Sequence, residues 1–193
     1  MKKIAVVYHS GFGHTKKLAQ AVARGAESVK ETEANLIPVE EVDQHWDALN
    51  ESDAIIFGSP TYMGSVSAPF KEFMDKSGKV WFEQKWKDKL AAGFTNSGSM
   101  SGDKFNVLVQ LATLAAQHSM IWVSLGLLPG ARNGDPSLNR IGSFLGAMAQ
   151  SDDDGPEVTP PQGDLLTAEH LGRRVAILAQ QNLASKQLEA SYN

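Results

Sequence analysis

The chain has 193 residues, 42% of them hydrophobic, which is enough to bury one sizeable core and favours a single domain spanning residues 1–193. Its 18 basic and 22 acidic residues give a net charge of −4, so the composition argues against a nucleic-acid-binding surface. The absence of cysteine excludes disulfides, thiolate nucleophiles and cysteine-ligated metals.

The N-terminal segment does not have the pattern of a targeting signal. Met1-Lys2-Lys3 is followed only by the apolar run Ile4–Tyr8, which is too short for a signal-peptide core. No apolar run approaches the length needed to cross a bilayer. We therefore expect no membrane insertion and a cytoplasmic location.

Apolar segments at regular intervals predict five β-strands. In chain order they are Ile4–Tyr8, Ala34–Val39, Ala54–Phe57, Leu90–Phe94 and Met120–Val123. Most of these runs are continuous rather than alternating, which is typical of parallel strands covered on both faces. Pro38 favours a sheet edge for the second segment, because proline cannot donate to the hydrogen-bond ladder.

Helical periodicity lies between these strands. Apolar stripes at 3.6-residue spacing run from Leu18 to Val29 and from Val107 to Ala115, and a last helix is predicted to follow Thr167 as its N-cap. Alternating strands and helices imply right-handed crossovers. We expect an α/β fold with a doubly wound five-stranded parallel sheet, order 2-1-3-4-5, in a three-layer α/β/α arrangement.

The loop after the first strand has the layout of a phosphate cradle. It contains two hydroxyls and two glycines immediately before a helical pattern, and its residues are Ser10, Gly11, Phe12, Gly13, His14 and Thr15. Backbone N–H groups at a helix start and the helix dipole both favour an anion. Lys16 occupies the place of the third glycine of the dinucleotide fingerprint, so a mononucleotide or other phosphomonoester is the better ligand.

Two more loops are expected at the same edge of the sheet, where ligands collect in such folds. One contains Pro60, Thr61, Tyr62, Met63 and Gly64; the other contains Asn96, Ser97, Gly98, Ser99, Met100 and Ser101. They offer small residues, hydroxyls and a polarizable wall for a flat ring. A phosphate plus a flat heterocycle indicates flavin mononucleotide (FMN).

The first loop and its flanks resemble the phosphate-loop pattern of flavodoxin-fold proteins. The matching positions are Val6, Val7 and Tyr8 in the strand, Ser10, Gly13 and Thr15 in the loop, and Ala19 and Val22 in the helix. Through Asp53–Thr61 and on to Gly126 the chain is most similar to the WrbA-type NAD(P)H:quinone oxidoreductases and the NADPH-dependent FMN reductase family.

This resemblance implies FMN bound by the three loops, with NADPH or NADH as co-substrate and a quinone-like acceptor. It also implies a catalytic His118 beside the flavin ring, Trp81 facing the substrate and Phe12 contacting the nicotinamide dinucleotide. For Trp81, packing under a long connection remains an alternative. Family members assemble, so a homo-oligomer, either dimer or tetramer, is a further expectation.

The expected reaction is two-electron transfer from NAD(P)H to a quinone-like acceptor, because no aromatic residue in Asn96–Gly102 would cover the second face of the ring. The alternatives are a flavodoxin-type carrier of single electrons and a fold relative that binds no flavin. No metal site is expected, and Asp152–Asp154 is interpreted as a solvated loop. The long segment from Leu127 to Leu166 is expected to form a lid or a subunit contact.

Overall fold

A computed structural model describes residues 1–132 and 134–191, with the backbone alone at 131 and 182–191. Its centre is a parallel sheet in the order β2-β1-β3-β5-β6. These strands are β1 (Lys2–Tyr8), β2 (Thr32–Pro38), β3 (Ala54–Tyr62), β5 (Leu90–Ser97) and β6 (Ile121–Trp122). The expected α/β fold class is therefore confirmed, although further strands lie off this path.

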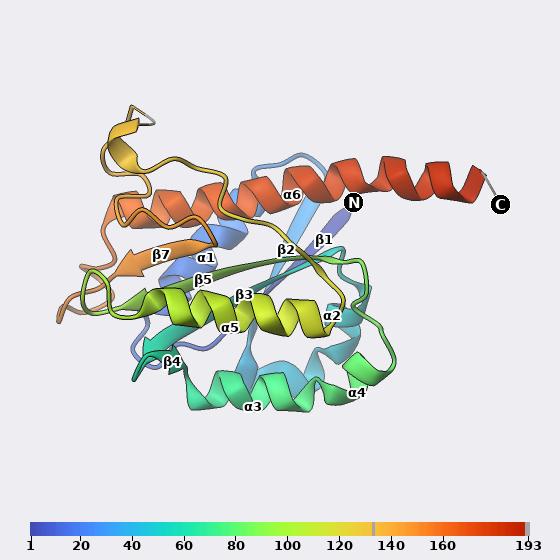
Figure 1. Cartoon of the computed structure of the whole chain (residues 1–193), viewed down its shortest axis with the longest axis horizontal. Helices are drawn as coiled ribbons and strands as arrows, with labels where there is room; N and C mark the ends of the chain where they lie inside the picture. Colours follow the sequence, from blue (N-terminus) through green and yellow to red (C-terminus); the bar gives the residue numbers. More distant parts are fainter. Residues whose placement is uncertain (133, 192–193) are drawn as a thin grey trace.

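Helices cover both faces of the sheet (Figure 1). α1 (His14–Glu27) and α6 (Gln162–Ser191) pack on one face. The other face is covered by η1 (Val39–Gln44), α2 (Trp46–Glu51), α3 (Ala68–Lys76), α4 (Gly78–Phe82) and α5 (Lys104–Gln117). β1, β3 and β5 are parallel neighbours. The loops that follow these strands therefore lie together at the carboxyl edge of the sheet.

The predicted number of strands was wrong: within residues 1–132 and 134–191, the sheet has seven. β4 (Ser65–Val66) adds a short antiparallel pairing to the end of β3. β6 pairs only with the start of β5, and β7 (Ala147–Gln150) pairs with its end. The fifth strand position is thus filled by two pieces, because the chain leaves the sheet after Trp122, forms η2 (Gly130–Arg132) and returns.

Thr167 is not the N-cap of the last helix. α6 begins five residues earlier, at Gln162, directly after Pro161, so Thr167 lies inside the helix. Its hydroxyl donates to the carbonyl of Gly163 at 2.7 Å and accepts from the N–H of Asn139 at 2.8 Å. In the sequence, a threonine whose hydroxyl bonds the carbonyl four residues earlier cannot be distinguished from a threonine that caps a helix, which explains the error.

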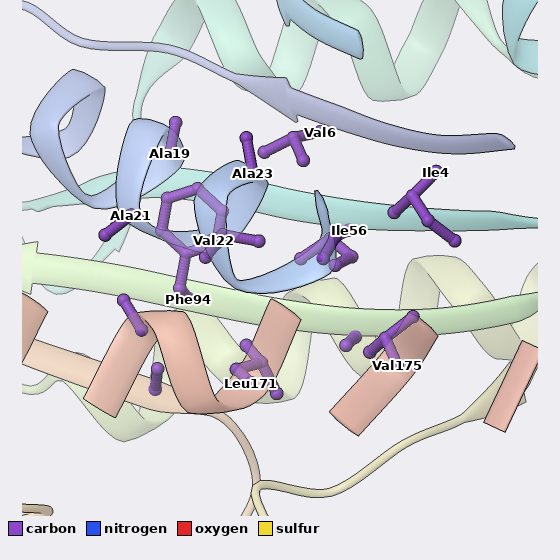
Figure 2. Close-up of a cluster of buried hydrophobic side chains, with 14 of the residues drawn as sticks. Ile4, Val6, Ala19, Ala21, Val22, Ala23, Ile56, Phe94, Leu171 and Val175 are labelled. Carbon is purple, nitrogen blue, oxygen red and sulfur yellow. The ribbon is translucent and has the colours of Figure 1, made fainter. Parts of the chain in front are cut away.

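The contact between α1 and α6 holds α1 on the sheet through its C-terminal half, and the N-terminus of the same helix carries the predicted cradle. A Cβ at Gly25 would collide with the carbonyl of Glu169, and one at Gly172 would collide with the carbonyl of Val22. Figure 2 shows Val22 of α1 and Leu171 and Val175 of α6 among the buried side chains of this layer. The two helices therefore approach backbone to backbone, which holds α1 rigidly on the sheet.

The described residues contain neither a membrane-spanning helix nor a cluster of metal ligands. None of the helices there combines the length and apolar character that crossing a lipid bilayer requires. Within the same ranges, no group of three or more His, Asp or Glu side chains is placed to hold a metal ion.

Candidate functional site

A cavity of 510 Å³ lies at the carboxyl ends of β1, β3 and β5. This volume is within the range of small-molecule sites. All three predicted loops contribute to its lining, with Phe12, His14, Thr15, Pro60, Thr61, Tyr62, Asn96, Ser97 and Gly98. The other side is formed by the segment 151–156, which follows β7.

The first loop forms a compact turn at the N-terminus of α1. Gly13 has a φ of 95°, in the left-handed region that favours glycine, and α1 begins at the next residue. The hydroxyl of Ser10 accepts from the N–H of Gly13 at 3.1 Å and from that of Lys16 at 3.0 Å. Ser10 therefore shapes the loop and holds N–H groups that an entering anion would compete for.

Tyr62 closes the first loop from the side of β3. A Cβ on Gly11 would lie 2.5 Å from the Tyr62 hydroxyl oxygen, so only glycine allows this approach. Burial raises the pKa of the Tyr62 phenol, and a bond from the Gly11 backbone opposes the shift. The Tyr62 ring meets Phe12 edge-on, with 6.3 Å between ring centroids. Phe12 itself is 75% exposed.

Asn96 offers the cavity a buried hydrogen-bond acceptor. Its side-chain N–H donates to Ser151 Oγ at 2.9 Å, while its Oδ1 is buried without a hydrogen-bond partner among the described residues. An unpaired buried carbonyl costs about 1–3 kcal/mol, which a ligand donor would recover. Asn96 therefore fits a ligand that presents an N–H or O–H, as a flavin does.

The remaining predicted cofactor-binding residues flank the cavity rather than line it. Met63 and Gly64 continue the turn after β3, and both have positive φ. Met100 and Ser101 line a neighbouring, more apolar cavity of 640 Å³. Ser99 lies between the two cavities along the chain, and its carbonyl accepts from Ser97 Oγ at 2.9 Å.

Lys104 was missed by the sequence analysis, because lysine in a first helical turn is ordinarily exposed. It is the first residue of α5 and is completely buried. Its ammonium donates to Ser97 Oγ at 2.7 Å, to the Ser99 carbonyl at 2.8 Å and to the Met100 carbonyl at 2.9 Å. Burial lowers its pKa to about 8.

The acidic residues Asp152–Asp154 are exposed, as expected of a solvated loop, but they also line the cavity. The ring of His14 is bonded to the carbonyl of Asp154 at 2.8 Å. The N–H of Asp152 donates to the carbonyl of Gly98 at 3.0 Å. This part of the Leu127–Leu166 segment thus rests on both the first and the third loop and gives the rim of the cavity negative charge.

His118 and Trp81 are not brought to this cavity. His118 follows the C-terminus of α5, and α5 starts beside the cavity and runs back for 14 residues, about 20 Å, to the opposite end of the sheet. Both residues line a separate cavity of 430 Å³. Within one chain, the structure therefore separates these two predicted residues from the three loops.

His118 is held as a buried neutral side chain. Its Nε2 is bonded to Ser77 Oγ at 2.9 Å, and its ring lies 4.3 Å from that of Trp86, centroid to centroid. Burial lowers its pKa to about 4. Trp81, by contrast, is 44% exposed and lines the same 430 Å³ cavity.

The chain is similar in sequence to a known family and to individual relatives. Residues 3–128 match the model of the family described as NADPH-dependent FMN reductase. The chain is 43% identical to "Flavodoxin FldP" of Pseudomonas aeruginosa, covering 94% of this chain and 98% of that one. It is 33% identical to an NAD(P)H dehydrogenase (quinone) of Archaeoglobus fulgidus, covering 93% and 98%.

The fold is similar to that of a solved structure of the same kind. A flavodoxin, WrbA-like protein from Agrobacterium tumefaciens superimposes with a TM-score of 0.75 at 44% identity, covering 94% of this chain and 99% of that chain.

Proposed function

The chain belongs to the NADPH-dependent FMN reductase family, and from this premise we propose that it transfers two electrons from NAD(P)H, through FMN, to a quinone. Family membership confirms the expected oxidoreductase class and the expected pairing of FMN with NAD(P)H. The quinone acceptor and the assignment of individual residues are parts of the proposal.

The residues of the cavity fit FMN. The loop Ser10–Thr15 would present helix-start N–H groups to a phosphate. Gly13 allows its turn through a positive φ, and Gly11 leaves room for the Tyr62 hydroxyl. The unpaired Oδ1 of Asn96 would accept from a donor on the ring or the ribityl chain. The cavity volume of 510 Å³ suits a ligand of this size.

One observation supports two-electron chemistry most directly: the mouth of the cavity is open and apolar on one side. Phe12 is 75% exposed and Tyr62 is 38% exposed, and Met63 beside them is fully exposed. The third loop, opposite them, contains no aromatic residue that could cover the second face of a ring. The ring face toward the third loop would therefore stay uncovered, and a planar nicotinamide or quinone could stack on it.

The reaction balances as hydride and proton transfer. NAD(P)H and one proton reduce the quinone to a quinol and leave NAD(P)⁺, with FMN supplying the hydride-carrying chemistry when bound. The chain's own residues would orient the reactants: Phe12 and Tyr62 would hold the planar rings, and backbone N–H groups of Gly98 and its neighbours would stabilise developing negative charge. The proton on the quinol is exchanged with solvent at the open mouth.

In this proposal, His118 and Trp81 act on the substrate only from a second copy of the chain. The length of α5 separates them from the cavity of their own chain, so the roles implied by the resemblance need an oligomer. Trp81 and Phe82, 44% and 80% exposed, offer an apolar contact surface for such an assembly. Sedimentation analysis tests this arrangement, and a monomer that retains full quinone reductase activity would exclude it.

The test of the proposed function is spectroscopic. The protein is purified, loaded with FMN and mixed anaerobically with NADPH or NADH while the visible absorbance is followed. We expect rapid bleaching of the flavin band. Stable FMN binding with no reduction by either nucleotide would contradict the enzyme proposal.

A second candidate function is that of a flavodoxin-type carrier of single electrons, which one relative and the acidic rim of the cavity favour. One relative, 43% identical, is named a flavodoxin. Asp152–Asp154 also place negative charge at the rim, where a basic electron-transfer partner would dock. For such a carrier, redox titration of the bound FMN would resolve two separate one-electron steps. A single two-electron step would favour the reductase.

A further inference from the structure

The buried ammonium of Lys104 has no explanation in the packing of the protein. A fully buried lysine is rare in folded proteins, and a positive charge at the first position of a helix opposes the helix dipole. Both effects lower the free energy of unfolding relative to an apolar residue at this position. A side chain kept at such cost indicates a role in the site that it adjoins.

The third loop folds around this ammonium. Nζ donates its three protons to three neutral oxygens: the Ser97 hydroxyl, the Ser99 carbonyl and the Met100 carbonyl. The turn is completed by Gly102, whose φ is 53° and where a Cβ would collide with the Ser97 hydroxyl. The conformation of the loop therefore depends on a donor at the position of Nζ.

These contacts also orient the peptide groups of the loop. In a trans peptide the N–H points away from the C=O of the same unit. Since the carbonyls of Ser99 and Met100 face the ammonium, the N–H groups of Met100 and Ser101 face the outside of the loop. In the part of the chain that the structure describes, neither N–H has a protein acceptor.

The charge of Lys104 is not neutralised locally. Of the carboxylates, Asp164 acts on it, but the two oxygens of Asp164 are bound by Arg140 Nε at 2.7 Å and Nη2 at 2.8 Å. Among the described residues, no ion pair includes Lys104. The positive charge is thus bonded directly to Ser97, which lines the cavity.

Resting on the proposed function, we propose that Lys104 is a positioning residue that holds the third loop for FMN and, through its buried charge, favours binding of the reduced, negatively charged flavin over the oxidised one. It touches the loop and not the ligand, and acts through Ser97 and the peptide groups that follow. The preference for reduced flavin raises the midpoint potential of the bound cofactor, which favours its reduction by NAD(P)H.

The test compares Lys104→Met and Lys104→Gln with Lys87→Met, which makes the same exchange at an exposed lysine. For each folded protein, the dissociation constant of oxidised FMN is measured by fluorescence and the midpoint potential of bound FMN by redox titration. Together they give the ratio of the dissociation constants for reduced and oxidised FMN.

We expect this ratio to rise about tenfold in Lys104→Met and Lys104→Gln, as the loss of a nearby charge at intermediate dielectric predicts, and to stay unchanged in Lys87→Met. Lys104→Gln keeps a donor for the loop carbonyls, so its affinity for oxidised FMN should fall less than that of Lys104→Met. It also provides the test if the methionine variant does not fold.

An unchanged ratio in Lys104→Gln, with FMN bound, would overturn the role of Lys104 and leave the proposed function intact. If the unmodified protein binds no FMN, the proposed function itself fails, so the two failures are distinguishable.

Discussion

The side-chain amide of Asn96 donates to Ser151 Oγ at 2.9 Å, and this bond joins the third loop to the segment that forms the opposite side of the cavity. The same side chain leaves Oδ1 buried and unpaired among the described residues. The two ends of this side chain can therefore be tested separately: the donor holds the wall of the cavity, and the acceptor is left available for a ligand that enters it.

Replacement of Asn96 by leucine should weaken FMN binding. The change removes the unpaired acceptor with little change in volume, and loss of one buried hydrogen bond predicts a dissociation constant about tenfold higher. The matched control is Ser151→Ala, which removes the partner of the amide and leaves Oδ1 in place. Fluorescence titration with FMN measures both. Equal losses in the two variants would show that Asn96 acts only as a structural link.

The double variant Ser10→Ala with Thr15→Val should bind FMN at least about a hundredfold more weakly. It removes two hydroxyls, one of which shapes the loop through the N–H groups of Gly13 and Lys16. Ser28→Ala, at the other end of α1, is the control for general damage to that helix. A double variant that is isolated yellow and fully loaded would show that these two hydroxyls do not hold the phosphate.

The acidic rim should oppose FMN at low salt. Asp153 and Asp154 are exposed and line the cavity, so they repel the phosphate dianion. Asp153→Asn with Asp154→Asn should bind FMN several-fold more tightly at about 0.01 M ionic strength, and the difference should shrink at about 0.5 M, where charges are screened. Asp152 is left unchanged because its carboxylate accepts from the side chain of Gln150. A gain in affinity that is independent of salt would contradict this electrostatic explanation.

His118 should make the stability of the protein depend on pH in the acidic range. Burial lowers its folded-state pKa from 6.5 to about 4, so between these values the unfolded chain binds the proton and the folded chain does not. The stabilising contribution of the neutral side chain is fully present above pH 6.5 and is lost progressively as pH falls toward 4, by about 3 kcal/mol in total.

Urea unfolding of the protein and of His118→Phe, from pH 4 to 7.5, measures this effect. The variant should be less stable at pH 7.5, where it lacks the bond to Ser77, and should show a shallower loss at low pH. His170, whose pKa is also lowered by burial, remains in both proteins and cancels in the difference. Parallel curves for the two proteins would contradict a neutral, buried His118.

Much of the fold could be predicted because the signals are local. Continuous apolar runs and 3.6-residue stripes gave the order of the five principal strands, and Pro38 placed its strand correctly at the edge. β7 was not predictable in this way, because Ala147–Gln150 is short and mixed in polarity and becomes a strand only by pairing with the end of β5. Thr167 failed as a cap for a similar reason, since its partner Asn139 is 28 residues away in the chain.

In the candidate site, too, features that depend on residues distant in the chain could not be predicted. The loops that follow strands were predictable, because parallel strands bring their carboxyl ends together. Lys104 was not, because its burial depends on how the third loop folds back over it. His118 was placed by resemblance, and only the direction of α5 reveals that its own chain cannot bring it to the cavity.

The proposed reaction passes two electrons from NAD(P)H to a quinone. The most direct measurement is a double-mixing stopped-flow experiment, in which the FMN-loaded protein is reduced anaerobically with one equivalent of NADPH or NADH and then mixed with one equivalent of benzoquinone. We expect the flavin absorbance to return completely in a single phase, with one quinol formed per flavin. Flavin that stays reduced in the presence of quinone, or that reoxidises only when a one-electron acceptor is supplied, would contradict the proposed reaction.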